Sequence, residues 1–190
     1  MKTIKENIIN EIEIKNSKFI ALVCKLESDN ISDILNQIKE KYPKATHYCY
    51  GYVYNDYSKY SDDGEPTGTA GAPIMNVLEK ENLSNTLIVV VRYFGGIKLG
   101  AGGLVRAYTK ATTEALKLAQ YIELTKGYKI KIEFDYSQEK TIDYLLNNYQ
   151  IIDKEYQEQI TYTALVDDNI LEKLHNYNYQ VLDDLYIEQK

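Results

Sequence analysis

Residues 86–103 read TLIVVVRYFGGIKLGAGG, and they carry the clearest indication of the fold. The first half is β-branched and continuously apolar, which predicts a central strand over 86–94 that is buried on both faces. Five glycines follow between Gly95 and Gly103. A helix with an apolar stripe is expected beyond them, to about Gln120. The stretch therefore predicts a buried strand that a glycine-rich loop joins to a helix.

The segments before this stretch complete a mixed pattern of strands and helices. A strand pair is expected over 11–14 and 18–26, and an amphipathic helix follows and ends before Pro43. Residues 55–71 are polar and rich in turn formers, which predicts a loop. A short helix then begins with Pro73 in its first turn.

The segment 46–54 alternates strictly and predicts a strand. The two expected faces are Tyr48, Tyr50, Tyr52 and Tyr54 on one side, and His47, Cys49, Gly51 and Val53 on the other. An exposed row of tyrosines can stack on bases, although 19 tyrosines in the chain also favour a purely compositional explanation. For His47 and Cys49, placement in the core is favoured over zinc binding or nucleophilic catalysis.

Residues 126–190 follow a simpler pattern of strand, helix, two strands, helix and strand. That βαββαβ order predicts a ferredoxin-like module. We therefore expect an α+β chain with one domain over 1–125 and a second over 126–190. The charge divides at the same place: residues 1–125 carry fifteen basic and fifteen acidic side chains, whereas 126–190 carry seven and thirteen, which gives the net charge of -6.

Composition excludes several classes of protein. The wholly apolar run 87–91 is far short of the ~20 residues of a membrane span. The N-terminus has no secretory pattern, so the two cysteines are expected to be reduced thiols in the cytoplasm. The acidic segment 126–190 repels phosphate, so any contact with nucleic acid is expected from residues 1–125.

The glycine-rich loop is the first candidate site. Glycines before a helix let backbone N–H groups approach an anion, and Arg92, Lys98 and Arg106 supply full positive charges. The loop matches neither the Walker A pattern nor a dinucleotide fingerprint. The alternative is that the glycines only permit a tight turn and close packing of the helix on the sheet.

The second candidate is residues 61–71, SDDGEPTGTAG. Asp62, Asp63 and Glu65 could hold Mg²⁺ or Ca²⁺, contact a partner or substrate, or belong to a plain turn. The contact with a partner is favoured, and Thr67 is included in it. No metal ligand, catalytic residue or cofactor is assigned.

Together these two segments resemble the YigZ/IMPACT family, over roughly residues 15–120. The family positions carried onto this chain are His47, Cys49, Asp62, Asp63, Glu65, Arg92, Gly95, Gly96, Lys98, Gly100, Gly102, Gly103 and Arg106. The resemblance implies a first domain with the two-layer fold of a ribosomal protein and a late domain of elongation factor G. The second domain is similar to the last domain of that factor.

The resemblance also implies a function. The eukaryotic members are regulators of translation, and nucleic-acid or ribosome binding is the usual suggestion for the bacterial branch. The leading hypothesis is a non-enzymatic protein, linked to translation or stress control, that engages RNA, the ribosome or a translation-associated protein through its glycine-rich loops. The alternatives are an enzyme acting on a phosphorylated small molecule, with carboxylate-held Mg²⁺, and a protein-only adaptor.

Overall fold

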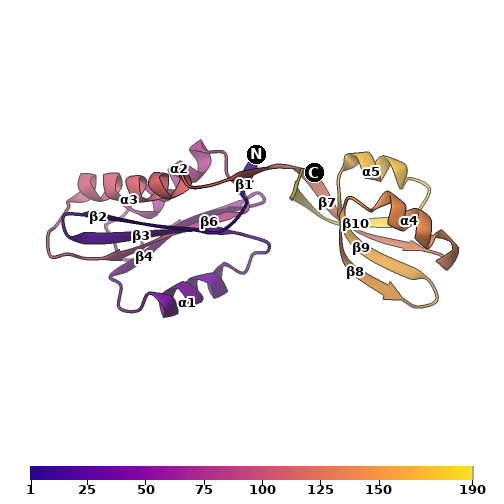
Figure 1. Cartoon of the computed structure of the whole chain (residues 1–190), viewed down its shortest axis with the longest axis horizontal. Coiled ribbons are helices and arrows are strands. Elements are labelled where there is room, and N and C mark those ends of the chain that lie inside the picture. Colours follow the sequence, from indigo (N-terminus) through magenta and orange to yellow (C-terminus); the bar gives the residue numbers. More distant parts are fainter. Residues whose placement is uncertain (190) are drawn as a thin grey trace. The chain divides into compact units, whose positions relative to one another are not determined.

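The computed structural model describes residues 1–189 and divides into two compact units, Met1–Ile122 and Glu123–Lys190 (Figure 1). Helices and strands alternate in both units, and most strand pairs are antiparallel, so the expected α+β fold with two domains is confirmed. The division between the units falls within one strand, β7 (Tyr121–Phe134).

The first unit is built on a five-stranded antiparallel sheet. Its strands lie in the order β2 (Ile8–Ile14), β3 (Ser17–Lys25), β6 (Thr86–Tyr93), β4 (His47–Tyr54) and β5 (Tyr57–Ser61). A short strand, β1 (Lys2–Ile4), pairs with β7. The apolar strand of the opening stretch is therefore the middle strand of the sheet, as predicted.

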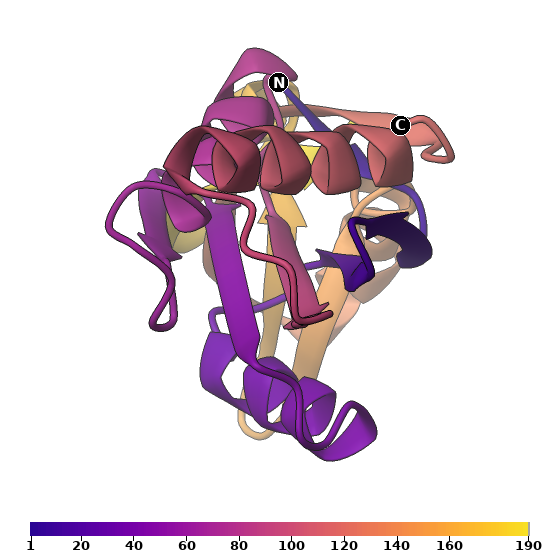
Figure 2. The same cartoon turned by 90° about the vertical axis from the view of Figure 1, so that its left-hand side faces the viewer.

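Three helices cover this sheet, and they lie on both of its faces (Figure 2). Helices α2 (Gly71–Lys80) and α3 (Ala101–Leu116) pack on one face, while α1 (Ile31–Lys41) packs on the other. Each face has its own hydrophobic core. The first unit thus adds a third layer to the two that the family resemblance implies.

Strand β6 explains why both faces must be covered. Its residues from Thr86 to Arg92 are all buried. Ile88 and Val90 belong to the core beneath α2 and α3, whereas Leu87, Val89 and Val91 belong to the core beneath α1. Successive side chains on a strand point to opposite faces, so a continuous apolar run needs a layer on each side.

Strand β5 was not predicted, because the segment 55–71 reads as a loop. The structure places a hairpin there, in which Tyr54 pairs with Tyr57 around Asn55 and Asp56. Asn55 adopts a positive φ of 51°, which suits a tight turn. Four of the five residues of β5 are exposed, so the strand lacks the apolar alternation by which strands are recognised in sequence.

The second unit has the predicted βαββαβ order. After β7 come α4 (Glu139–Leu145), β8 (Gln150–Tyr156), β9 (Ile160–Val166), α5 (Asp168–Lys173) and β10 (Asn178–Glu188). The antiparallel sheet runs β10-β7-β9-β8, and its buried residues pack against both helices. A 3-10 turn precedes α4, and Asp135 is its N-cap residue.

Among residues 1–189, no helix combines the length and the apolar character that a membrane crossing requires.

Candidate functional site

The glycine-rich loop links β6 to α3 at one end of the first unit (Figure 2). Gly95 lies against the hairpin between β2 and β3: its N–H donates to Oγ of Ser17 at 3.1 Å, and a Cβ there would overlap the backbone of Asn16. Gly100 precedes α3 with a φ of 71°, where L side chains are strained. Close approach and positive φ therefore account for these two glycines.

The remaining loop residues face solvent. Gly96, Lys98, Gly102 and Arg106 are exposed, and Gly103 is half-buried. A Cβ at Gly102 would lie 3.8 Å from Nη1 of Arg106, so this guanidinium lies beside the first turn of α3. That turn carries no acidic residue and no side-chain cap.

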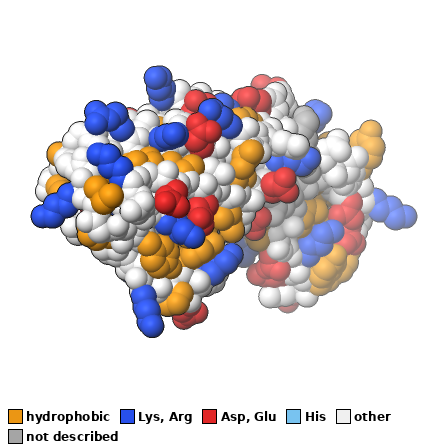
Figure 3. All heavy atoms as spheres, turned by 60° about the vertical axis from the view of Figure 1, so that its left-hand side comes forward, with side chains coloured by type: hydrophobic (Ala, Val, Ile, Leu, Met, Phe, Trp, Pro, Cys, Tyr) orange, Lys and Arg blue, Asp and Glu red, His pale blue; other side chains and the backbone are white. Residues whose placement is uncertain are grey.

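A helix start bears partial positive charge, and here a full positive charge lies beside it. Exposed apolar side chains, Phe94, Ile97 and Val105, belong to the same segment. Figure 3 shows basic and hydrophobic side chains interspersed on this end of the first unit.

Asp62 holds the second loop to the start of α2. Its carboxylate accepts hydrogen bonds from the N–H groups of Gly68, Ala70 and Gly71 at 2.8–2.9 Å. Burial by itself would raise the pKa of Asp62, but the three N–H donors outweigh it and hold the pKa below its ordinary value. Helix α2 has no cap from its own Ala70, so Asp62 supplies this function from eight residues away.

Asp63 ties the same loop to β4. Its Oδ2 accepts from the N–H of Tyr48 at 2.7 Å, and its carbonyl oxygen lies 2.8 Å from Nδ1 of His47. Thr67, in contrast, is exposed. The carboxylates of Asp62 and Asp63 are thus both engaged by groups of this chain.

Glu65 is the buried member of the acidic loop, with 4% of its side chain exposed. Its Oε1 accepts from Nη1 of Arg92 at 2.6 Å and from the hydroxyl of Tyr108 at 2.7 Å. Nε2 of His47 lies 3.8 Å from its other oxygen. The ion pair joins the second loop to the middle strand, and the hydroxyl joins it to α3.

Arg92 differs from the other two cations that the sequence singles out, because it is 4% exposed. Besides Glu65 it contacts Oγ of Ser17 at 3.4 Å, and its guanidinium lies 5.4 Å and 5.5 Å from the ring centroids of Phe19 and Phe94. Nε is buried without a hydrogen-bond partner among residues 1–189. We call Ser17, His47, Glu65, Arg92 and Tyr108 the buried charged cluster.

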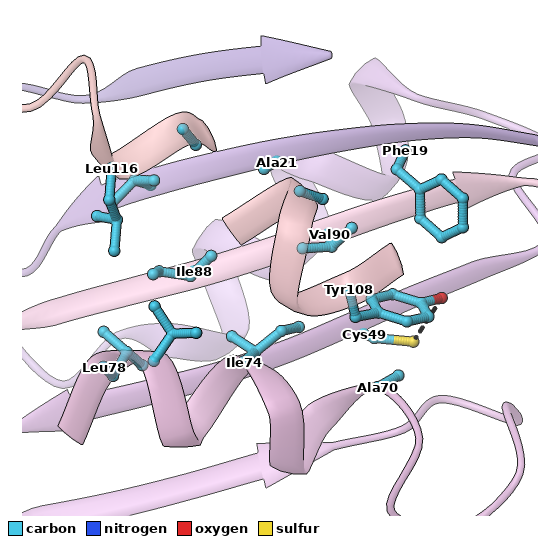
Figure 4. Close-up of a cluster of buried hydrophobic side chains, with 14 of the residues drawn as sticks. Phe19, Ala21, Cys49, Ala70, Ile74, Leu78, Ile88, Val90, Tyr108 and Leu116 are labelled. Atoms are coloured by element: carbon cyan, nitrogen blue, oxygen red, sulfur yellow. Dashed lines mark hydrogen bonds between the residues drawn. The ribbon is translucent and has the colours of Figure 1, made fainter. Parts of the chain in front are cut away.

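Cys49 adjoins this cluster from β4 (Figure 4). Its Sγ lies 2.9 Å from the carbonyl oxygen of Asp62 and 3.3 Å from the hydroxyl of Tyr108. Burial raises the pKa of Cys49 to about 12, against the opposing effect of the Tyr108 contact, and burial also raises the pKa of Tyr108. A neutral thiol is a weak nucleophile, so the expected core placement of Cys49 agrees with its surroundings.

The structure brings the two candidate loops together, but through buried groups. Glu65 and Arg92 meet directly, while Lys98 and Arg106 remain exposed. Within residues 1–189, no three His, Cys, Asp or Glu side chains are grouped as metal ligands. The sequence analysis did not single out Ser17 or Tyr108. A polar hydroxyl beside the apolar stripe of α3 is the signal by which Tyr108 could have been found.

The comparison with family models places both loops inside one family domain. The Impact N-terminal domain matches residues 15–116. This chain belongs to the IMPACT family. The matched residues lie within the first unit, and both glycine-containing loops lie among them.

Relatives extend the similarity beyond that domain. IMPACT family member YvyE of Bacillus subtilis is 39% identical over 87% of this chain and 79% of its own length. IMPACT family member YigZ of Escherichia coli is 35% identical over 76% of this chain and 75% of its own length. A crystal structure of a hypothetical protein is 28% identical, covers 100% of this chain and 98% of its own, and gives a TM-score of 0.73.

Proposed function

We propose that this IMPACT family protein is a non-enzymatic binding or regulatory protein linked to translation or stress control. It engages RNA, the ribosome or a translation-associated protein through the exposed part of the glycine-rich loop. Membership of the family supports the link to translation, since the resemblance implies translational regulators. Contact with RNA is assigned to the first unit, because the acidic segment 126–190 repels phosphate.

One observation carries the proposal: the acidic and basic groups of the two loops have different environments. The carboxylates of Asp62, Asp63 and Glu65 are bound by groups of the chain itself, whereas Lys98 and Arg106 are exposed. The charge available to a partner at this end is therefore positive. Gly96, Gly102 and Gly103 keep side chains away from the first turn of α3, where N–H groups face outward.

The same observation disfavours the enzyme alternative. That reaction needs carboxylates to hold Mg²⁺ or to accept a proton, and these carboxylates already accept hydrogen bonds from the chain. The thiol of Cys49 is kept neutral by burial. A binding function requires neither group.

The test is charge reversal at the exposed cations. We expect Lys98→Glu/Arg106→Glu to weaken binding to ribosomes in pelleting assays, or to RNA in shift assays, by at least about tenfold at low salt. The matched control is Lys80→Glu/Lys140→Glu, which changes net charge equally at exposed positions elsewhere. Arg92 is left unchanged, because its reversal would place a second negative charge against buried Glu65.

Two results would count against the proposal. If the wild type binds neither ribosomes nor RNA at low salt, the nucleic-acid form is wrong, and affinity capture from a nuclease-treated lysate then tests the protein-only adaptor. If the control variant weakens binding as much as the loop variant, the contact depends on total charge and the loop is not the site.

A further inference from the structure

The face of the sheet on which α1 packs also carries a row of tyrosines. Strand β4 directs alternate residues to this face, and the register of β4 with β5 places Tyr57 beside Tyr54 and Lys59 beside Tyr52. We call the following residues the tyrosine surface: Tyr48, Tyr50, Tyr52, Tyr54 and Tyr57.

Helix α1 leaves these rings partly exposed. Its buried residues, Ile31 and Ile38, belong to a core with residues of β3 and β6, and the four tyrosines of β4 pack against that core as partly buried side chains. Tyr48 is the ring next to the end of α1, where its hydroxyl donates to the carbonyl oxygen of Tyr42 at 2.6 Å. Each of the four is half-buried, and Tyr57 on the edge strand is 77% exposed. The rings therefore present part of their area to solvent.

The rings are arranged in a row. Those of Tyr50 and Tyr52 lie 6.4 Å apart between centroids and are inclined by 22°. Same-face positions of a strand are about 6.6 Å apart, so the tyrosines repeat along β4 at a regular interval. Rows of aromatic rings on a sheet are how sequence-tolerant proteins bind single-stranded nucleic acid, one base stacking on each ring.

The charge beside the tyrosine surface fits a polyanion. Lys39 of α1 places its Nζ 5.8 Å from the ring centroid of Tyr48, and exposed Lys59 lies opposite Tyr52. The hairpin segment 46–61 contains one acidic side chain, that of Asp56, which lies in the turn between β4 and β5. Lysines along a row of aromatic rings supply the phosphate contacts that stacking requires.

We infer that the tyrosine surface binds single-stranded nucleic acid by base stacking. This site goes beyond the proposed function, which uses the glycine-rich loop, and it needs no contact with Lys98 or Arg106. It does not distinguish RNA from DNA, since stacking uses features that both share. A duplex buries its bases and is not a ligand.

Two tyrosines of β5 provide a test variant and its matched control. Tyr57 belongs to the tyrosine surface, whereas Tyr60 lies on the opposite face of β5, opposite Gly51, and is 49% exposed. Both side chains are exposed, so Tyr57→Ala and Tyr60→Ala are expected to fold. The probe is a fluorescein-labelled oligouridylate at low salt, with fluorescence anisotropy as the readout.

We expect Tyr57→Ala to weaken binding of the oligouridylate roughly 5- to 150-fold, the range for loss of one stacked base, and Tyr60→Ala to leave it unchanged. Lys59→Gln should lower the slope of log affinity against log salt by about 0.7. Tyrosine fluorescence of the wild type, which has no tryptophan, should be quenched by the ligand.

The inference is wrong if the wild type fails to bind oligouridylate, if Tyr57→Ala and Tyr60→Ala bind alike, or if a duplex of equal length binds as tightly. Binding that is lost only in Lys98→Glu/Arg106→Glu also overturns it, while supporting the proposed function. Capture of a protein from nuclease-treated lysate that depends on Tyr57 would show instead that this surface docks a polypeptide.

Discussion

The buried charged cluster and the exposed part of the glycine-rich loop contain the same types of charged side chain but differ in what their charges do. In the cluster, Arg92 and Glu65 form an ion pair at 2.6 Å with each side chain at most 5% exposed. In the loop, Lys98 and Arg106 are exposed. Arg92 and Lys98 are six residues apart in the chain, yet one fixes the fold and the other is available to a partner.

Residue type therefore does not separate a buried, structural charge from an exposed charge in this chain. A buried charge requires a partner, and removing that partner is strongly destabilising. An exposed charge contributes little to stability. Substitutions in the two regions should therefore affect different measurements, stability in the first and binding in the second.

The largest effect is expected at Glu65. Glu65→Ala leaves Arg92 buried without its counter-charge, and we expect the free energy of unfolding to fall by about 3–5 kcal/mol in urea denaturation. The double variant Glu65→Ala/Arg92→Met removes both charges and should recover part of the loss. A loss below about 1 kcal/mol in the single variant would mean that the pair is not buried in solution.

The next effect is expected at Asp62, and it depends on pH. Asp62→Asn weakens three hydrogen bonds from backbone N–H groups, and we expect a loss of about 2 kcal/mol at pH 7.

The folded-state pKa of Asp62 lies below its ordinary value of 3.8, so its contribution is present above that pH. It is lost as pH falls through the folded-state pKa. Denaturation curves of wild type and variant should therefore converge below about pH 4, and a constant difference down to pH 2 would contradict this assignment.

A smaller effect is expected at Tyr108. Tyr108→Phe removes the hydroxyl that donates to Glu65 at 2.7 Å and leaves the ring in the core. Loss of one hydrogen bond to a charged acceptor costs about 1.5–2 kcal/mol, measured by the urea midpoint. The control is Thr109→Val on the same helix, which removes a hydroxyl that does not contact Glu65. It tests whether the loss of any hydroxyl from α3 lowers the stability.

The smallest effect on stability is expected in the loop. Lys98→Ala/Arg106→Ala should change the free energy of unfolding by less than about 0.5 kcal/mol, because both side chains are exposed. Binding to ribosomes or RNA should nevertheless weaken in the same preparation. A stability loss as large as that of Tyr108→Phe would remove the contrast between the two regions.

The sequence was sufficient for the elements whose apolar periodicity is strong. The buried strand β6 could be predicted because a run of β-branched residues has few alternatives, and the βαββαβ order of the second unit because each element has its own period. Strand β5 could not, since an exposed edge strand has no apolar pattern. The apolar run of β6 was enough to predict a layer on each face of the sheet. It did not say which helix packs on which face, because that depends on tertiary packing.

The sequence marked the two candidate loops, which the structure brings together, but it did not separate the roles of their residues. Asp62, Asp63 and Glu65 read as three similar carboxylates, although one is buried against Arg92 and two bind backbone N–H groups. The partners responsible, such as Ser17 and Tyr108, lie far away in the chain, and their contacts follow only from the folded arrangement.

The buried charged cluster has a consequence for the order of folding. Its members extend from Ser17 to Tyr108 and come from β3, β4, β6, α3 and a loop, so their contacts close long stretches of chain. Closing long stretches of chain carries an entropic cost, so we expect these contacts to form late in folding, after the strands have paired. We therefore expect the Glu65–Arg92 ion pair to be largely unformed in the folding transition state. Glu65→Ala should then raise the unfolding rate and leave the refolding rate almost unchanged in stopped-flow measurements. On this view the cluster determines the lifetime of the folded state, and it has little influence on the rate at which that state forms.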